Sequence, residues 1–238
     1  MKIEVWSDFV CPFCYVGKRR LEEALEKLQL SVEVEFKSFE LDPAAEVEVD
    51  MNVYEMLAKK YGTSIAQAEN MTKGIKEHGE QAGIEFDFDN SIPTNTFDAH
   101  RLAKFAALNG LDLKLTENLL NAHFVDGRHI GDKESLLFIA EDIGMDIKEA
   151  KEVLEGTRFS DEVRMDENEA RQLGIQGVPF FVINRKYAIS GAQPAEVFES
   201  TLKKIWEEEH GALPLQSVSG NSDLMCSDNG CEVEKEEK

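Results

Sequence analysis

The first forty residues switch between two periodicities, and this order restricts the folds open to the chain. Residues 2–7 alternate apolar and polar side chains as in a strand, and residues 31–39 alternate again. Between them, an apolar stripe over residues 21–28 predicts an amphipathic helix that begins near Pro12. Because a strand, a helix and a strand in this order form a crossover unit, the two strands are predicted to be parallel.

The remaining chain divides into a long helical block and a second mixed segment. From about Val49 to Glu155 the pattern predicts five or six helices and no strand. Beyond them come a helix that ends at Gly174, two short strands in residues 178–191 and a final amphipathic helix. The order β-α-β, helical block, α-β-β-α predicts an α/β fold. A small mixed sheet flanked by helices carries a large all-helical insertion.

Three segments follow from this order. Residues 1–48 and 156–210 are predicted to form one discontinuous domain, and residues 49–155 are the insertion. Residues 211–238 are rich in Gly, Ser, Asn and acidic residues. They are predicted to be a flexible tail, because they bury too little apolar surface to offset the entropy of ordering.

The charge of the chain restricts its partners. The 238 residues carry a formal net charge of -21, which repels phosphate backbones and anionic lipid. Nucleic-acid and membrane roles are therefore not expected. Since the N-terminus also lacks the apolar stretch of a signal peptide, we expect a cytoplasmic protein. The oligomeric state is not indicated.

The four cysteines fall in two close pairs, and the first pair lies where the first strand becomes a helix. Unsatisfied N–H groups and the helix dipole favour a thiolate at Cys11, while Cys14 lies one turn further in. We predict that Cys11 attacks a disulfide and that Cys14 resolves the mixed disulfide. Two alternatives stay open, half of a four-cysteine zinc site or two inert buried cysteines. We expect no metal.

A proline directly before the apolar strand near residue 180 marks a second candidate feature. Pro179 fits a strand only at its first position. A cis proline there brings the Val178 backbone next to the cysteine pair, where an extended peptide adds as a strand. The alternative is a trans proline that only begins the strand. We assign Pro12, Phe13, Val178 and Pro179 to substrate binding.

Four motifs together resemble the DsbA-like branch of the thioredoxin superfamily and, within it, FrnE-type cytosolic dithiol-disulfide isomerases. They are "SDFVCPFCYVGKRRLE", "PTNTFDAHRL", "GRHIGDKESL" and "LGIQGVPFFVINRKYAISGAQ". The resemblance covers about residues 1–209. It implies a thioredoxin-like fold, Cys11 as the nucleophile, Cys14 as the resolving thiol and Pro179 as the cis proline of the substrate loop.

Several polar residues near these motifs keep two interpretations. Asp8 relays protons or caps the helix start. Asn95 caps a helix or contacts substrate, and His100 and Arg101 pack between helices or contact substrate. Oxidising relatives carry histidine where this chain has Phe13, which implies a less oxidising pair.

The second pair, Cys226 and Cys231, encloses the turn-forming residues Ser-Asp-Asn-Gly. Similarly spaced tail cysteines in FrnE-like proteins imply an auxiliary redox pair. Because the tail is part of the same chain, the effective concentration of its cysteines near Cys11 is on the order of mM, which favours exchange with Cys11. The alternatives are a metal-binding tail and a passive oxidised loop.

The leading interpretation is a cytosolic thiol-disulfide oxidoreductase or isomerase that acts on protein or peptide disulfides. No cofactor is expected, and glutathione or another thiol would serve as redox partner. The alternatives are a non-redox glutathione-dependent transferase or isomerase of the same fold, and a zinc-binding or partner-binding protein.

Overall fold

A computed structural model of the chain describes residues 1–211, 226–227 and 230–231. Residues Met1–Lys203 form one compact unit and Lys204–Lys238 a second one. The sheet, the helices α1–α8 and the first cysteine pair belong to the first unit. The predicted boundaries of the insertion, at residues 49 and 155, lie inside this unit and stay a prediction.

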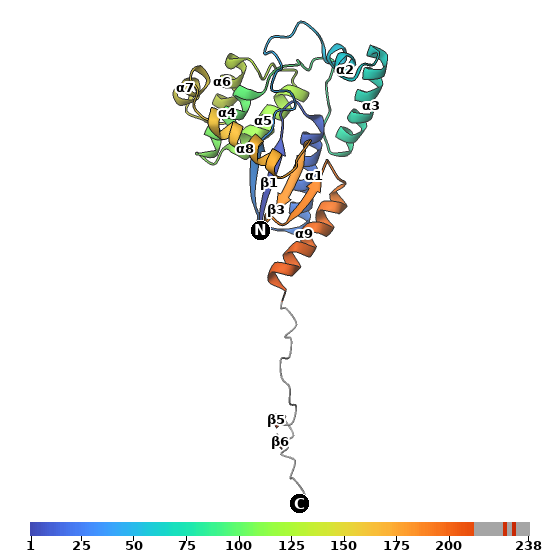
Figure 1. Cartoon of the computed structure of the whole chain (residues 1–238), viewed down its shortest axis with the longest axis vertical. Coiled ribbons are helices and arrows are strands. Elements are labelled where there is room, and N and C mark those ends of the chain that lie inside the picture. The colour runs from blue at the N-terminus through green and yellow to red at the C-terminus, as the bar shows by residue number, and fades with distance from the viewer. Residues whose placement is uncertain (212–225, 228–229, 232–238) are drawn as a thin grey trace, which may run out of the picture. The chain divides into compact units, whose positions relative to one another are not determined.

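Four strands form one mixed sheet in the order β2-β1-β3-β4 (Figure 1). Its strands are β1 (Lys2–Ser7), β2 (Glu33–Ser38), β3 (Phe180–Ile183) and β4 (Tyr187–Ser190). β1 and β2 are parallel, as predicted, whereas β3 runs antiparallel to both β1 and β4. The hairpin turns at Asn184 and Arg185, whose φ angles of 51° and 55° match the twist of the two strands. β1 is therefore a central strand, and the first cysteine pair follows its carboxyl end.

Helix α1 (Pro12–Leu28) begins where the sequence predicts it. Pro12 occupies the first helical position, where its missing N–H leaves no hydrogen bond unmade. The helix ends at Leu28, and its C-cap Gln29 adopts the left-handed conformation with a φ of 52°. Its buried face includes Cys14, Tyr15 and Leu21, so the start of α1 is held firmly against the core.

The remaining helices confirm the predicted helical block. Between residues 49 and 155, all of them described, six helices and no strand are present. They are α2 (Val53–Tyr61), α3 (Ile65–Gln81), α4 (Phe97–Ala107), α5 (Asp112–Phe124), α6 (Lys133–Asp142) and α7 (Ile147–Glu155). After them come α8 (Ser160–Gln172) and α9 (Ala195–His210). In Figure 1, α4 to α8 gather in one group, and α2 and α3 lie side by side in another. None of the helices in the described ranges has the length and apolarity to cross a bilayer.

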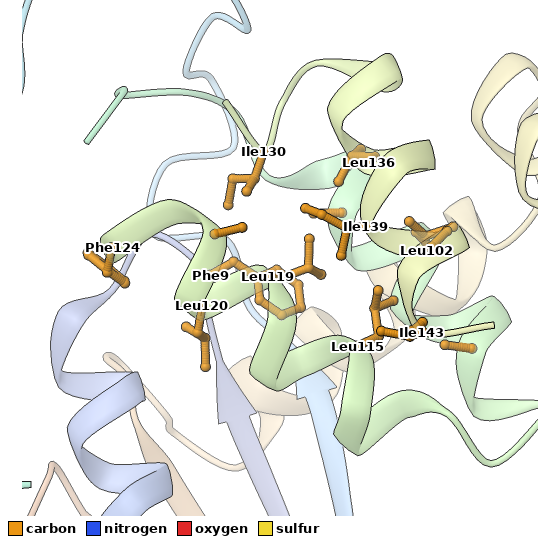
Figure 2. Packing of buried hydrophobic residues seen from close by; sticks show 14 of the residues in the cluster. Phe9, Leu102, Leu115, Leu119, Leu120, Phe124, Ile130, Leu136, Ile139 and Ile143 are labelled. Atoms are coloured by element: carbon orange, nitrogen blue, oxygen red, sulfur yellow. The ribbon is translucent and has the colours of Figure 1, made fainter. Parts of the chain in front are cut away.

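A large apolar cluster joins the helical block to the segment that carries the cysteines. Figure 2 shows side chains of α4, α5 and α6, among them Leu102, Leu119 and Leu136, in one cluster with Phe9. Phe9 lies in the loop between β1 and α1, and Tyr15 of α1 belongs to the same cluster. The apolar core of the helices thus fixes the loop that precedes Cys11.

The start of α4 differs by one residue from the sequence prediction. The N-cap is Thr96, and its side chain makes no capping hydrogen bond. Asn95, predicted as the N-cap, lies just before it and accepts a hydrogen bond from the Phe97 N–H at 2.8 Å. Asp98 pairs with Arg101 instead of reaching back to the helix start. The asparagine still stabilises the helix start, through a turn one residue earlier than a standard cap.

Candidate active site

Cys11 and Cys14 occupy the junction of β1 and α1. Cys11 is the N-cap of α1 and Cys14 lies in its first turn, with the Cys14 N–H donating to the Cys11 carbonyl at 3.0 Å. Both carry free thiols, and they are only 5% and 2% exposed. The junction therefore holds two thiols one turn apart, with the outer one at the positive end of a helix.

The two thiols differ in their surroundings. Burial, followed by the neighbouring Cys11 sulfur, raises the pKa of the Cys14 thiol well above its ordinary value. The hydroxyl of Ser7 and the backbone of Asp8 oppose this shift without cancelling it. Cys14 therefore holds its proton at neutral pH, and it needs a proton acceptor before it acts as a nucleophile.

The loop before β3 lies directly beside Cys11. The Val178–Pro179 peptide bond is cis, the geometry expected from the sequence. The Cys11 thiol donates to the Val178 carbonyl oxygen with 3.7 Å between sulfur and oxygen. The Pro179 carbonyl accepts from the Gly191 N–H at 2.9 Å, which ties the loop to the end of β4.

Gly17 permits the close approach of α1 to this loop. A Cβ at position 17 would lie 3.0 Å from the Pro179 side chain and 3.1 Å from the Phe181 ring. Any larger residue would force the helix or the loop to move. A glycine inside an otherwise helical stretch was the available sequence signal for this contact.

An open groove runs along the same loop. It has a volume of about 410 Å³ and is lined by Gly174, Gln176, Gly177, Val178, Pro179, Phe180, Ser190 and Gly191. Next to Cys11, Pro12 is half-buried and the Phe13 ring is 38% exposed. The Phe13 ring lies 6.1 Å from the ring of His78 on α3. The structure thus brings Cys11 and Val178 into contact and leaves Phe13 on the surface nearby.

Asp8 is 1% exposed and does not cap α1, so the capping interpretation is wrong. Its Oδ2 accepts from the Leu41 N–H at 2.7 Å. Its Oδ1 lies 3.4 Å from Nε2 of His100, without hydrogen-bond geometry. His100 is therefore a neighbour of this carboxylate. Arg101 serves the helix packing, since it donates to the carbonyls of Val153 and Gly156.

Sequence reasoning missed a cluster of buried polar groups beside Asp8. Five buried side-chain atoms there make no hydrogen bond to any described residue. They are Ser7 Oγ, Asp8 Oδ1, His100 Nε2, Thr116 Oγ1 and His123 Nδ1. Burial lowers the pKa of His123 to about 4, so this imidazole is neutral at pH 7. The only sequence signals were Ser7 at the end of an apolar strand and histidines on apolar helix faces. Neither signal indicates that these polar groups meet beside Asp8.

Cys226 and Cys231 lie in two short strands, β5 (Cys226–Ser227) and β6 (Gly230–Cys231). These strands pair antiparallel, and Cys226 is opposite Cys231 in the backbone register. The two residues between them, 228 and 229, lie outside the described residues, as do 212–225 and 232–238. The auxiliary role of this pair stays a prediction.

No group of three or more His, Cys, Asp or Glu side chains is arranged to hold a metal ion within the described residues.

Three comparisons place the chain among known proteins. The model of the DsbA-like thioredoxin domain matches residues 2–203. The uncharacterized protein YwbO of Bacillus subtilis is 32% identical over 202 residues, 84% of this chain and 94% of that protein. A probable DsbA oxidoreductase from Streptomyces coelicolor, SCO1869, is 38% identical with a TM-score of 0.83, covering 99% of this chain and 100% of that one.

A more distant structure shares the fold alone. The cytosolic disulfide reductase DsbM of Pseudomonas aeruginosa, solved with GSH, is 16% identical with a TM-score of 0.63 and covers 87% of this chain and 100% of that one. With the family match, the resemblance to the DsbA-like branch and the thioredoxin-like fold are both confirmed. The chain belongs to the family of DsbA-like thioredoxin domains.

Proposed function

We propose that the chain is a cytoplasmic thiol-disulfide oxidoreductase or isomerase that acts on protein and peptide disulfides. The observation that carries the proposal is the contact between the Cys11 thiol and the Val178 carbonyl, 3.7 Å apart, at the side of an open groove. Membership of a family that includes oxidoreductases supports it.

The groove suits an extended peptide. Val178 and Pro179 present backbone at its wall, and a substrate segment would add there as a strand. Pro12 and the exposed ring of Phe13 border Cys11 and would contact the residues flanking the substrate disulfide. In this arrangement recognition depends on the substrate backbone, which favours broad specificity.

The chemistry divides between the two thiols. Cys11, at the positive end of α1, attacks as a thiolate, and one substrate sulfur leaves with the electron pair of the broken bond. Cys14 then loses its proton and attacks Cys11, which releases the second substrate sulfur and leaves a Cys11–Cys14 bond. Because burial raises the pKa of Cys14, this thiol stays protonated and does not compete with Cys11 for the first attack.

The redox partner in this proposal is glutathione or another small thiol, and no bound cofactor takes part. The structure of DsbM with GSH shows one protein of this fold with that tripeptide. Asp8, 1% exposed beside the pair, takes part in proton movement. Nucleic acids and anionic membranes are not partners, given the net charge of -21.

The tail pair acts in this proposal as an auxiliary dithiol. Cys226 and Cys231 are partners in the backbone register of β5 and β6, and the proposal is that their thiols form a reversible disulfide. Replacing both by serine should slow turnover with glutathione. Equal turnover of the variant and the wild type would contradict the auxiliary role of the tail pair and would leave the role proposed for Cys11 unaffected.

Reduction of insulin disulfides tests the main proposal. The wild type should reduce insulin with glutathione as electron source, and Cys11→Ser should abolish the activity. Met71→Ser, a change at a side chain that is 41% exposed on α3, is a matched control and should keep it. Zinc content measured on the same sample covers the metal-binding alternative. An inactive wild type that conjugates or isomerises a small substrate with glutathione would favour the non-redox alternative.

A further inference from the structure

A second cavity lies between the sheet and the helices α4, α5 and α8. It has a volume of about 270 Å³, and residues of β1 and β2 form its sheet side. None of the residues that line it also lines the groove at the Val178 loop. The cavity is therefore a separate space from the groove proposed to bind the substrate disulfide.

The walls of this cavity are mainly apolar. The rings of Phe9, Phe36 and Phe159 line it, together with Ala103 and Leu108. A dry apolar cavity of about 150 Å³ in a protein is already large enough to bind benzene. This cavity therefore has room for a six-membered ring with a substituent, and its three phenylalanine side chains offer aromatic contacts to such a ring.

One end of the cavity is polar and buried. Its lining residues Ser7, His100 and Thr116 are 5%, 3% and 0% exposed, whereas Leu108 at the other end is exposed. The side-chain atoms Ser7 Oγ, His100 Nε2 and Thr116 Oγ1 have no hydrogen-bond partner among the described residues. Buried polar atoms need such partners. A hydroxyl group both donates and accepts, so it can pair with any of the three.

The charges around the cavity favour a neutral ligand. The charged lining residues are Glu35, Lys37, Lys104, Asp112 and Glu162. Lys104 already pairs with Asp166. Lys37 pairs with Glu35 at 2.7 Å. Both lining cations are thus engaged, and an ionised ligand group of either sign would lose its hydration between the apolar walls.

We propose that this cavity binds a small neutral aromatic molecule that carries a hydroxyl group. The ring lies among the phenylalanine side chains, and the hydroxyl lies at the end lined by Ser7, His100 and Thr116. There it reproduces the hydrogen bonds of any water that it displaces, which a methyl group of similar size does not. Because neither cysteine of the redox pair takes part, this binding does not depend on the proposed function.

Fluorine NMR titration of the full-length protein at pH 7 tests the ligand class with three probes. They are 4-fluorophenol, 4-fluorotoluene, which lacks the hydroxyl, and 4-fluorobenzoate, which is an anion. The phenol should bind at least about tenfold more tightly than each of the other two. No binding of the phenol, or equal affinity for the phenol and either other probe, overturns the proposal.

Filling the cavity tests the place of binding. Ala103→Leu, at a half-buried lining position on α4, should weaken binding of 4-fluorophenol at least about tenfold, because the added side chain occupies the space of the ring. Ala66→Leu makes the same change at an exposed position on α3 and should leave the affinity unchanged. Binding that survives Ala103→Leu contradicts the proposal.

Thr116→Val tests the polar end without changing the shape of the side chain much. It should weaken binding of 4-fluorophenol by about threefold or more and leave that of 4-fluorotoluene unchanged, since only the phenol uses the lost hydroxyl. The preference for the phenol over the toluene should therefore fall. An unchanged preference in this variant would contradict the placement of the ligand hydroxyl.

Discussion

The helical core and the region behind the cysteines are buried to the same degree, but the first consists of apolar side chains and the second contains several polar ones. Around Leu119 the side chains are apolar and close-packed, as Figure 2 shows. Behind Cys14, by contrast, Ser7, His100 and Thr116 are buried with polar atoms that no described residue satisfies. The first region supplies stability, and the second gives up stability to keep polar groups beside the thiols.

The largest loss of stability should come from the apolar region. Leu119→Ala removes a fully buried side chain from the cluster and should lower the free energy of unfolding by about 2–5 kcal/mol. Chemical denaturation measures this. Leu108→Ala, at a side chain that is 70% exposed, is the control and should change stability by less than about 0.5 kcal/mol. Similar losses at both sites would mean that the helical core does not carry the stability.

The contact between α1 and the loop that carries Pro179 should be the next most sensitive to substitution. Gly17→Ala places a Cβ 3.0 Å from Pro179, and overpacking of this kind costs about 1–3 kcal/mol. It should also slow disulfide exchange, because the loop beside Cys11 is displaced. The control is Gly74→Ala in α3, where a Cβ meets no atom within 4 Å. That change should stabilise by about 0.5–1 kcal/mol, and a stabilising Gly17→Ala would rule out the tight approach.

The polar region should make the free energy of unfolding depend on pH. The folded-state pKa of His123 is about 4 against an ordinary 6.5, so between these values the unfolded chain binds a proton that the folded protein excludes. Stability is therefore lost as pH falls below 6.5, by about 2 kcal/mol at pH 5.

Denaturation of the wild type and of His123→Asn at pH 7 and pH 5 isolates this contribution. The fall in stability between the two pH values should be about 2 kcal/mol smaller in the variant. Comparing each protein with itself removes the structural cost of the substitution. Equal falls in the two proteins would show that His123 is not held neutral.

The smallest effect should come from Thr116. Thr116→Val replaces a hydroxyl that no described residue satisfies with a methyl group, and should raise the free energy of unfolding by up to about 1 kcal/mol. A variant that is less stable than the wild type would show that the hydroxyl has a partner there.

Local periodicity was sufficient to predict the order of strands and helices, the cysteine pair at a helix start and the proline before β3. Each of these depends on residues near one another in sequence. The polar groups behind Cys14 come from distant parts of the sequence, because His100 and Thr116 lie on α4 and α5 and Ser7 is at the end of β1. Only the packing of those helices against the sheet, which periodicity does not specify, brings the three together.

Two smaller differences have the same origin. Asn95 has a capping residue's chemistry, but the chain turns one residue later, so Thr96 is the N-cap. Asp8 lies three residues before Cys11, the N-cap of α1, and its carboxylate accepts from the Leu41 N–H after β2. Asp8 thus has a long-range partner in place of a local one, whereas Asn95 keeps its local bond to the Phe97 N–H and also donates from its side-chain amide to Glu40 at 3.3 Å.

Trapping of a mixed disulfide tests the central claim most directly. Cys14→Ser incubated with a peptide disulfide should gain the mass of one peptide thiol, and peptide mapping should place it on Cys11. The double variant Cys11→Ser, Cys14→Ser should gain none beyond what peptide mapping places on Cys226 and Cys231. No adduct in Cys14→Ser, or an equal adduct in the double variant, would contradict the assignment of Cys11 as the thiol that attacks the substrate.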